Sequence, residues 1–225
     1  MVKNIVAIGG AVIKTAWNEI RNLASNGAFD VLIHNGASLF HDFQRATEEL
    51  PGHSYSLADL LEDYRKDEAA SLLVWEFLRE NARAPKDSLT RICEDQGINV
   101  LLAVALGTDF WHLFDQDWGL IARRCRNDFL GLIEDMGTPF KFFCLGSAVI
   151  HPELFAKALA VAKSEQFTTV VVDFREMYRP RSRVAVYGQY LLMEHKEFLN
   201  SWIESRKRER NEADKAETQA HRPTL

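Results

Sequence analysis

The sequence predicts an α/β protein, a single Rossmann-like domain built on a parallel sheet of five or six strands with helices on both faces. Two observations lead to this prediction. A short apolar run at residues 4–8 ends at Gly9, and a second run at residues 31–34 ends near Gly36. Each run leads into a stretch with helical character, which is how a parallel strand delivers its backbone to the start of a helix. The carboxyl edge of such a sheet is where a nucleotide-sized ligand binds.

Five runs are short and apolar, with little alternation between apolar and polar residues. This pattern is typical of strands that are buried on both faces. The expected strands cover residues 5–8, 31–34, 99–105, 140–145 and 169–174. The expected helices cover residues 15–25, 56–80, 85–97, 117–136, 152–163 and 194–203. Strands that alternate with helices imply right-handed crossovers and a parallel sheet.

The length of 225 residues fits one domain, which we expect to cover residues 1–204. Residues 205–225 are rich in charge and nearly free of large apolar residues, so they are predicted to form a charged tail, helical or disordered. Acidic residues follow the basic cluster at residues 206–208, a pattern that favours a solvated helix end over a nucleic-acid-binding tail.

The composition argues against several classes of protein. The net charge of −5 and the pI of about 5.8 argue against nucleic acid or an anionic membrane as the main partner. No apolar run approaches the ~20 residues of a membrane span, and no basic leader precedes the first strand. The cysteines Cys93, Cys125 and Cys144 are odd in number and far apart, which favours free thiols in a reducing cytoplasm. No C-x-x-C, H-x-x-x-H or H-E-x-x-H spacing is present, so no metal site is expected.

The first candidate site is the turn at Gly9-Gly10. Glycines permit a tight turn and a close approach of the backbone to a phosphate. The turn does not match G-x-G-x-x-G, and no acidic residue ends the second expected strand, where a ribose is usually held. The alternative interpretation is a plain strand-to-helix turn.

The second candidate site combines a strand end at His34 with a helix that is expected to begin near Ser38. His41 and Asp42 then fall in the first turn of that helix, close to the positive end of its dipole. A histidine in this position tends to stay neutral, and a neutral imidazole can accept a proton. The alternative is that Asp42 caps the helix and His41 is a packed surface residue.

A third loop, residues 107–112, follows the strand expected at residues 99–105. Asp109 and His112 lie in it together with two aromatic residues, Phe110 and Trp111. Acidic, imidazole and aromatic groups at the carboxyl end of a strand are the components of a ligand pocket. The alternative is a loop whose aromatic residues cover the edge of the sheet.

Two further strand ends carry polar groups. Gly146-Ser147 follows the fourth expected strand and offers backbone N–H groups, and Asp173 lies near the end of the fifth, where a carboxylate can hold a ribose diol. Arginines downstream can bind a phosphate or a carboxylate, or form an ion-pair network between subunits. This segment contains Arg175, Tyr178, Arg179, Arg181 and Arg183.

A family resemblance rests on residues 9–15 (GGAVIKT) and 27–44 (GAFDVLIHNGASLFHDFQ). These residues resemble the NAD-binding domain of archaeal and cyanobacterial ornithine cyclodeaminases, a LOR/SDH-like domain within the wider deoxyhypusine synthase-like fold group. Residues 145–147 (LGS) and 172–173 (VD) resemble two later loops of that family. Residues 148–151 (AVIH) replace the family's acidic residues, 50–53 (LPGH) replace its Gly-Thr-Ser-Leu-Gly loop, and the Trp-Gly-Lys motif of deoxyhypusine synthase is absent.

The resemblance implies a Rossmann-like sheet that binds NAD at its carboxyl edge, with a tendency to form tetramers. It places His41 and Asp42 near the reactive end of the cofactor. The residues that it places around the dinucleotide are Gly9, Gly10, Asn35, Gly36, Gly146, Ser147 and Asp173.

Our leading hypothesis is an NAD-binding cytoplasmic protein that acts on a small amine or amino acid by transient hydride transfer. In this hypothesis NAD oxidises a C–N bond to an imine, which loses ammonia or accepts a new amine. His41, Asp42, His112 and Asp109 are the residues expected to do substrate and proton work, and a dimer or tetramer is expected. The alternatives are a non-catalytic nucleotide- or metabolite-binding module or subunit of a larger assembly, and a plain oligomerisation protein.

Overall fold

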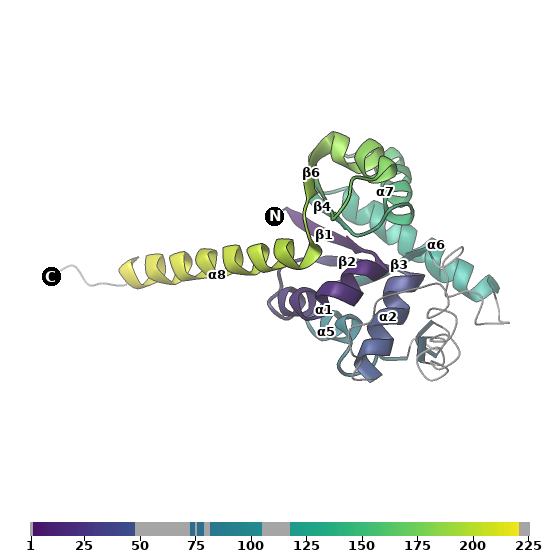
Figure 1. Cartoon of the computed structure of the whole chain (residues 1–225), viewed down its shortest axis with the longest axis horizontal. Helices are drawn as coiled ribbons and strands as arrows, with labels where there is room; N and C mark the ends of the chain where they lie inside the picture. The colour runs from purple at the N-terminus through teal and green to yellow at the C-terminus, as the bar shows by residue number, and fades with distance from the viewer. Residues whose placement is uncertain (1, 48–72, 75, 79–81, 105–117, 221–225) are drawn as a thin grey trace.

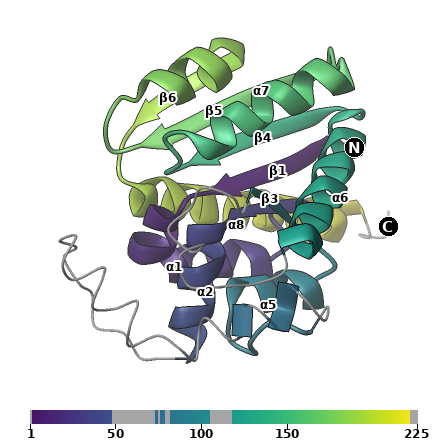
Figure 2. The same ribbon diagram turned by 90° about the vertical axis from the view of Figure 1, so that its right-hand side faces the viewer.

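The computed structural model describes residues 2–47, 73–74, 76–78, 82–104 and 118–220. A six-stranded sheet with the order β3-β2-β1-β4-β5-β6 forms its centre, and every neighbouring pair of strands is parallel. Figure 2 shows β6, β5, β4 and β1 side by side. This order is that of the Rossmann fold, so the predicted fold class is confirmed. The strands are β1 (Lys3–Ile8), β2 (Val31–Asn35), β3 (Asn99–Val104), β4 (Phe140–Leu145), β5 (Phe167–Asp173) and β6 (Gly188–Leu192).

Helices cover both faces of the sheet, as predicted. Alternate residues of β1 point to opposite faces, so Val6 and Ile8 belong to one buried cluster and Ile5 and Ala7 to another. The first cluster contains residues of α1 (Gly10–Ser25), α5 (Leu89–Asp95) and α8 (His195–Ala220). The second contains residues of α6 (Trp118–Met136) and α7 (Ile150–Ala162), and α7 lies in front of the sheet in Figure 2.

The helix α2 (Gly36–Thr47) packs beyond the β2–β3 side of the sheet. Leu39, Phe40 and Phe43 on its buried side form a third apolar cluster with Leu102 of β3 and Ile121 of α6. This packing fixes the position of α2 at the carboxyl ends of the strands, next to the first turn of α1.

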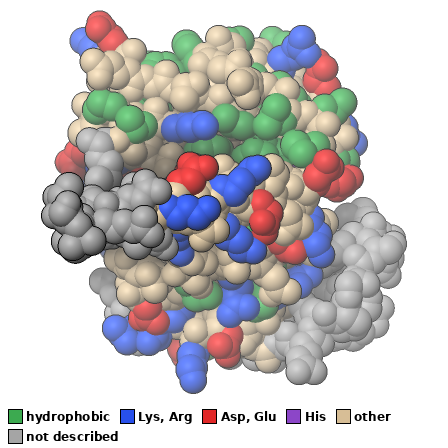
Figure 3. Space-filling view, turned by 90° about the vertical axis from the view of Figure 1, so that its left-hand side faces the viewer, with side chains coloured by type: hydrophobic (Ala, Val, Ile, Leu, Met, Phe, Trp, Pro, Cys, Tyr) green, Lys and Arg blue, Asp and Glu red, His purple; other side chains and the backbone are tan. Residues whose placement is uncertain are grey.

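The long helix α8 begins at the sheet and continues outward for 26 residues. Near its start Trp202 stacks on Phe143 of β4 with the ring centroids 4.5 Å apart, and Arg210 donates hydrogen bonds to Asn26 at the end of α1. Figure 1 shows the C-terminal end of α8 extending beyond the rest of the molecule. On the face seen in Figure 3, basic and acidic side chains are intermingled, and hydrophobic side chains gather above them.

The sequence did not predict β6. Its side chains are intermediate or exposed, because β6 is an edge strand paired only with β5. The run therefore lacks the continuous apolar character that marks the buried strands. Asp173 consequently ends the fifth of six strands. Pro180–Val184 and Ala185–Tyr187 form two short helical turns before β6.

Several helix starts differ from the predicted ones. The expected helix 15–25 begins earlier, at Gly10, and contains a kink at Ala16 (φ −143°, ψ 32°), so its first turn follows β1 directly. The expected helix 85–97 begins at Leu89, because the Ser88 side chain accepts a hydrogen bond from the Arg91 N–H and caps it. The helix expected at residues 56–80 lies largely outside the described residues.

The turns after β1 and β4 meet at the centre of the sheet, where the chain connections diverge to the two sides. The N–H of Gly9 donates to the carbonyl of Leu145 at 2.9 Å, and the N–H of Gly146 donates to the carbonyl of Val172 at 3.1 Å. A Cβ atom on Gly9 would lie 1.9 Å from the carbonyl oxygen of Gly146. Only glycine permits this approach, and the ligand crevice of a Rossmann sheet lies at this point.

We predict that Gly9→Ala lowers the free energy of unfolding by about 3 kcal/mol or more, because the added methyl group must displace backbone atoms. Gly131→Ala in α6 is the control, since its nearest contact would be Leu101 Cδ2 at 3.8 Å. This control should stabilise the protein by up to about 1 kcal/mol. Urea denaturation of both variants measures the difference, and equal midpoints would contradict the packing argument.

Candidate functional site

The carboxyl ends of three adjacent strands bring together five of the seven residues predicted to bind a cofactor. Gly9 and Gly10 follow β1, Gly146 and Ser147 follow β4, and Asp173 ends β5. Ser147 and Asp173 are buried. These residues lie along one edge of the sheet, at the point where the order of the strands reverses its direction along the chain.

The first turn of α1 is suited to an anion. Its N-cap is Gly9, which has no side chain to accept the first N–H groups, and the turn contains no acidic residue. Lys14 lies one turn further along, and Arg45 of α2 donates a hydrogen bond to the Lys14 carbonyl at 2.6 Å. Uncapped N–H groups and two nearby cations fit the phosphates of a dinucleotide.

The glycines around this turn are also required by internal packing. A Cβ on Gly10 would lie 3.3 Å from the His41 ring of α2. Gly146 has a φ of +59°, and a Cβ there would lie 3.0 Å from the His195 ring and 3.1 Å from Val12. The space beside these glycines is therefore occupied by side chains of the protein itself.

Asn35 and Gly36, the other two predicted cofactor residues, lie at the end of β2 and are buried. The Asn35 side-chain oxygen accepts a hydrogen bond from the Ser38 N–H at 2.8 Å, and the Ser38 hydroxyl accepts one from the Asn35 N–H at 3.0 Å. These bonds cap α2. The polar groups at the end of β2 are thus used within the chain.

The Asp42 carboxylate is buried and fully engaged in hydrogen bonds within the chain. It is fully buried and accepts hydrogen bonds from Trp17 Nε1 at 2.8 Å, from the Leu89 and Thr90 N–H groups at 2.7 and 2.8 Å, and from the Thr90 hydroxyl at 2.7 Å. Burial raises the pKa of the carboxyl, and these four hydrogen bonds oppose the rise. Asp42 therefore caps α5 and ties it to α1 and α2.

The placement of His41 and Asp42 in a first helical turn was wrong. Because α2 begins at Gly36, both residues lie in its second turn. His41 is buried, its Nδ1 lies 3.0 Å from Gln44 Oε1, and burial, aided by Lys14, lowers its pKa to about 4. The imidazole is neutral at pH 7, as expected, but the main cause is burial. Asp109 and His112 lie outside the described residues.

Two further buried histidines lie at this edge, one on each face of the sheet. His34 is satisfied, with Nδ1 3.0 Å from the Ser38 hydroxyl and Nε2 3.3 Å from the Thr90 hydroxyl. His151 lies near the start of α7, close to the His34 backbone. Neither of its ring nitrogens has a hydrogen-bond partner of good geometry within the described residues. Burial lowers the pKa of each ring to about 3.

His195 is a residue that the sequence analysis missed. It is the first residue of α8, follows the edge strand β6, and is 2% exposed. Its ring meets the Phe174 ring edge-on at 6.1 Å between centroids. No local motif marks it, because its place beside Gly146 depends on how β6 and α8 return to the sheet.

The arginine segment after β5 forms ion pairs within the chain. Arg179 and Arg183 lie 3.3 and 3.5 Å from the Glu153 carboxylate of α7, and Arg181 pairs with Glu176. The two pairs with Glu153 hold this segment against α7.

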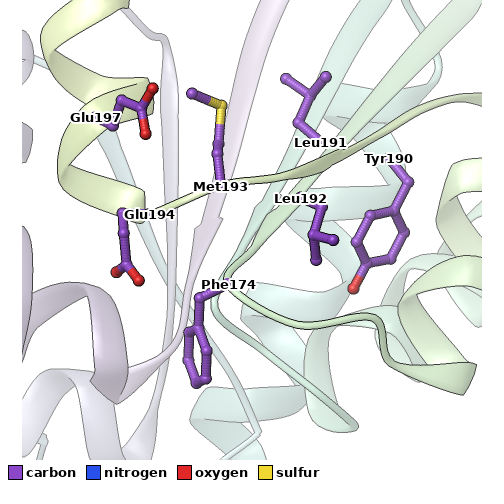
Figure 4. A pocket seen from close by; sticks show the side chains of 7 residues that line it. All are labelled: Phe174, Tyr190, Leu191, Leu192, Met193, Glu194 and Glu197. Carbon is purple, nitrogen blue, oxygen red and sulfur yellow. The ribbon is translucent and has the colours of Figure 1, made fainter.

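An open groove of about 550 Å³ lies beside the end of β5. Figure 4 shows Glu194 and Glu197 on one side of it, Tyr190 and Leu192 on the other, and Phe174 between them. The Tyr190 hydroxyl accepts a hydrogen bond from the Met177 N–H at 3.0 Å and donates one to the Arg175 carbonyl at 2.9 Å. The groove thus combines aromatic, apolar and acidic groups.

None of the described helices is long and apolar enough to cross a membrane. The described residues also contain no group of three or more His, Cys, Asp and Glu side chains placed to hold a metal ion.

Solved structures share this fold. No protein-family model and no curated protein matches the chain. The ternary complex of AgrE with ornithine and NAD⁺ matches with a TM-score of 0.59 and 15% identity, over 90% of this chain and 30% of AgrE. A protein from Methanococcus maripaludis S2 assigned to the LOR/SDH group matches with a TM-score of 0.62 and 12% identity, over 92% of this chain and 62% of that one.

The wider fold group is represented as well. A protein from Entamoeba histolytica assigned as a deoxyhypusine synthase matches with a TM-score of 0.53 and 10% identity, over 89% of this chain and 74% of that one. The predicted resemblance to the LOR/SDH-like and deoxyhypusine synthase-like fold group is confirmed at the level of the fold. The chain spans less than a third of the length of AgrE.

We predict that Asp42→Asn lowers the free energy of unfolding by about 2–4 kcal/mol, because the amide group turns one acceptor into a donor that faces other donors. The control is Asp95→Asn, which removes an exposed ion pair with Arg91 and should change stability by no more than about 0.5 kcal/mol. Chemical denaturation distinguishes the two. Equal effects of both substitutions would show that Asp42 has no capping role.

We also predict that stability falls as the pH is lowered from 6.5 towards 4. His34, His41 and His151 have folded pKa values of about 3, 4 and 3, below the ordinary 6.5, so protons bind the unfolded chain first. Each histidine contributes about 1.4 kcal/mol per pH unit in this window. Urea denaturation between pH 7 and 4 measures the slope, which His41→Gln should reduce by about one proton. A flat profile would contradict the assigned neutral state.

Proposed function

We propose that the chain is an NAD-binding protein that acts on a small amine or amino acid through transient hydride transfer, as in a deaminase, cyclodeaminase or aminoalkyl transferase. The observation that carries this proposal is the meeting of two glycine turns at the centre of a parallel sheet with Rossmann strand order. The shared fold with AgrE, whose structure was solved with ornithine and NAD⁺, supports the choice of cofactor and substrate class.

The dinucleotide would be held by the first turn of α1 at Gly9 and Gly10, by Gly146 and Ser147 after β4, and by Asp173 at the end of β5. The uncapped N–H groups of α1 would bind phosphate, and the Asp173 carboxylate would accept hydrogen bonds from ribose hydroxyls. When bound, NAD would accept a hydride from the C–N carbon of the substrate and return it.

In this proposal the protein positions the amine and moves its protons. His41 is neutral and lies beside Gly10, so its imidazole is suited to exchange a proton with a bound amine. Asp109 and His112 keep the substrate role proposed from the sequence. Asp42 has a positioning role and does not contact the substrate, because its oxygens already accept four hydrogen bonds from α1 and the start of α5.

The second candidate function is a non-catalytic nucleotide- or metabolite-binding module, or a subunit of a larger assembly. The four hydrogen bonds to Asp42 favour it, because they remove one of the proposed catalytic carboxylates. Ammonia release from L-ornithine or L-arginine in the presence of NAD⁺ distinguishes the two functions. Binding without turnover supports the module.

We further propose a cytoplasmic homo-oligomer, a dimer or a tetramer. The exposed apolar side chains near the edge strand, Tyr178, Val186 and Leu192, support an interface between copies of the chain. Light scattering of the purified protein tests this assembly, and a monomer at micromolar concentration would contradict it.

We predict that the purified protein binds NAD⁺ and is stabilised by it, by about 2.7 kcal/mol at a ligand concentration 100 times Kd. Asp173→Asn should weaken binding about tenfold, since a charged acceptor is lost. The matched control is Asp30→Asn at the amino end of β2, where the carboxylate accepts a hydrogen bond from the Asn4 N–H. Calorimetry measures all three proteins, and no binding of NAD⁺ or NADH at millimolar concentration would refute the proposed function.

A further inference from the structure

His195 occupies the space between the start of α8 and the turn after β4. A Cβ atom on Gly146 would lie 3.0 Å from both Cε1 and Nε2 of its ring, so the imidazole lies directly against the backbone of the proposed cofactor site. Phe174, which lines the open groove, meets the same ring edge-on. The imidazole therefore contacts both the glycine turn and a residue of the groove.

The two nitrogens of this ring differ. The Val172 backbone lies close enough to the ring to raise its pKa, while Nε2 is buried and has no hydrogen-bond partner within the described residues. Burial lowers the pKa of the ring, and the nearby Asp173 carboxylate opposes this effect. A neutral imidazole that donates from one nitrogen leaves a lone pair on the other. Nε2 is consequently a buried acceptor without a donor.

The buried histidines at this edge differ in this respect. The ring nitrogens of His151 also lack a hydrogen-bond partner within the described residues. His34, equally buried, has a hydroxyl group beside each ring nitrogen. Buried polar atoms in folded proteins are nearly always paired, and an unpaired one calls for a ligand or an ordered water. At Nε2 the missing group must be a donor, because the nitrogen can only accept.

We propose that His195 is a ligand-contacting residue of the carboxyl-edge site, and that its Nε2 accepts a hydrogen bond from an N–H or O–H group of the bound ligand. The inference rests on the proposed function. Two sources of this donor are chemically equivalent at Nε2, namely a hydroxyl or carboxamide of the dinucleotide and the amino group of the substrate. Asp173 at the end of β5 adds a negative charge that favours such a donor.

The test compares three variants of the full chain by calorimetry with NAD⁺ alone, and then with L-ornithine in the presence of saturating NAD⁺. His195→Leu removes the acceptor and should weaken one probe at least tenfold, whereas His195→Gln retains an acceptor oxygen and should stay within about threefold of the wild type. The probe that loses affinity identifies the source of the donor. His34→Gln is the control, which should lose thermal stability and keep its affinity for both probes.

A second readout does not depend on mutants. In protein labelled with ¹⁵N-histidine, the Nε2 resonance of His195 should move when the ligand binds, because a hydrogen bond to a lone pair changes the shielding of that nitrogen. Wild-type binding with an unmoved resonance, or unchanged affinity of His195→Leu for both probes, would overturn the inference alone. Failure of the wild type to bind either probe would refute the proposed function and the inference together.

Discussion

The contact between the turns after β1 and β4 is the constraint on which the site depends. It exists because Gly9 has no side chain, so the Gly146 carbonyl can lie where a Cβ would otherwise be, only 1.9 Å from its ideal position. The N–H of Gly9 donates to the Leu145 carbonyl and the N–H of Gly146 donates to the Val172 carbonyl, so the hydrogen bonding of the sheet extends into the two turns. The first turns of α1 and α7 are brought to the same edge by backbone packing, before any ligand contributes.

A buried carboxylate, that of Asp42, fixes the helices that surround this contact. Asp42 accepts donors from Trp17 on α1 and from Leu89 and Thr90 at the start of α5, so one side chain fixes three helices relative to one another. Burying a charge is costly unless hydrogen bonds replace water, and here four do so. The rigid support that results keeps His41 against Gly10. Residues near a site are therefore divided between those that build it and those that are free to meet a ligand.

The limits of prediction follow from the same physics. Runs such as residues 140–145 are apolar throughout because both faces of the sheet are covered, so the buried strands could be read locally, while β6 at the edge could not. The glycine turns were found because their signal is local. The partners of Asp42 lie as far as 48 residues away, and His195 reaches Gly146 only through the return of α8, so neither role leaves a pattern in the neighbouring sequence.

Neutral imidazoles give the carboxyl edge of the sheet uncharged hydrogen-bonding groups in addition to its charged residues. Burial keeps His34, His41 and His151 uncharged at pH 7, while three of the four arginines that follow β5 form ion pairs with Glu153 or Glu176. Anions can then be attracted by the uncapped first turn of α1 with Lys14 and Arg45 beside it, and uncharged donors by an imidazole nitrogen such as Nε2 of His195. A ligand that carries phosphates at one end and hydroxyl or amide groups at the other matches both halves of this edge. Burial keeps the imidazoles uncharged, so the edge has one part suited to phosphates and another suited to uncharged donors. This pairing is the physical reason to favour a dinucleotide over a simple anion.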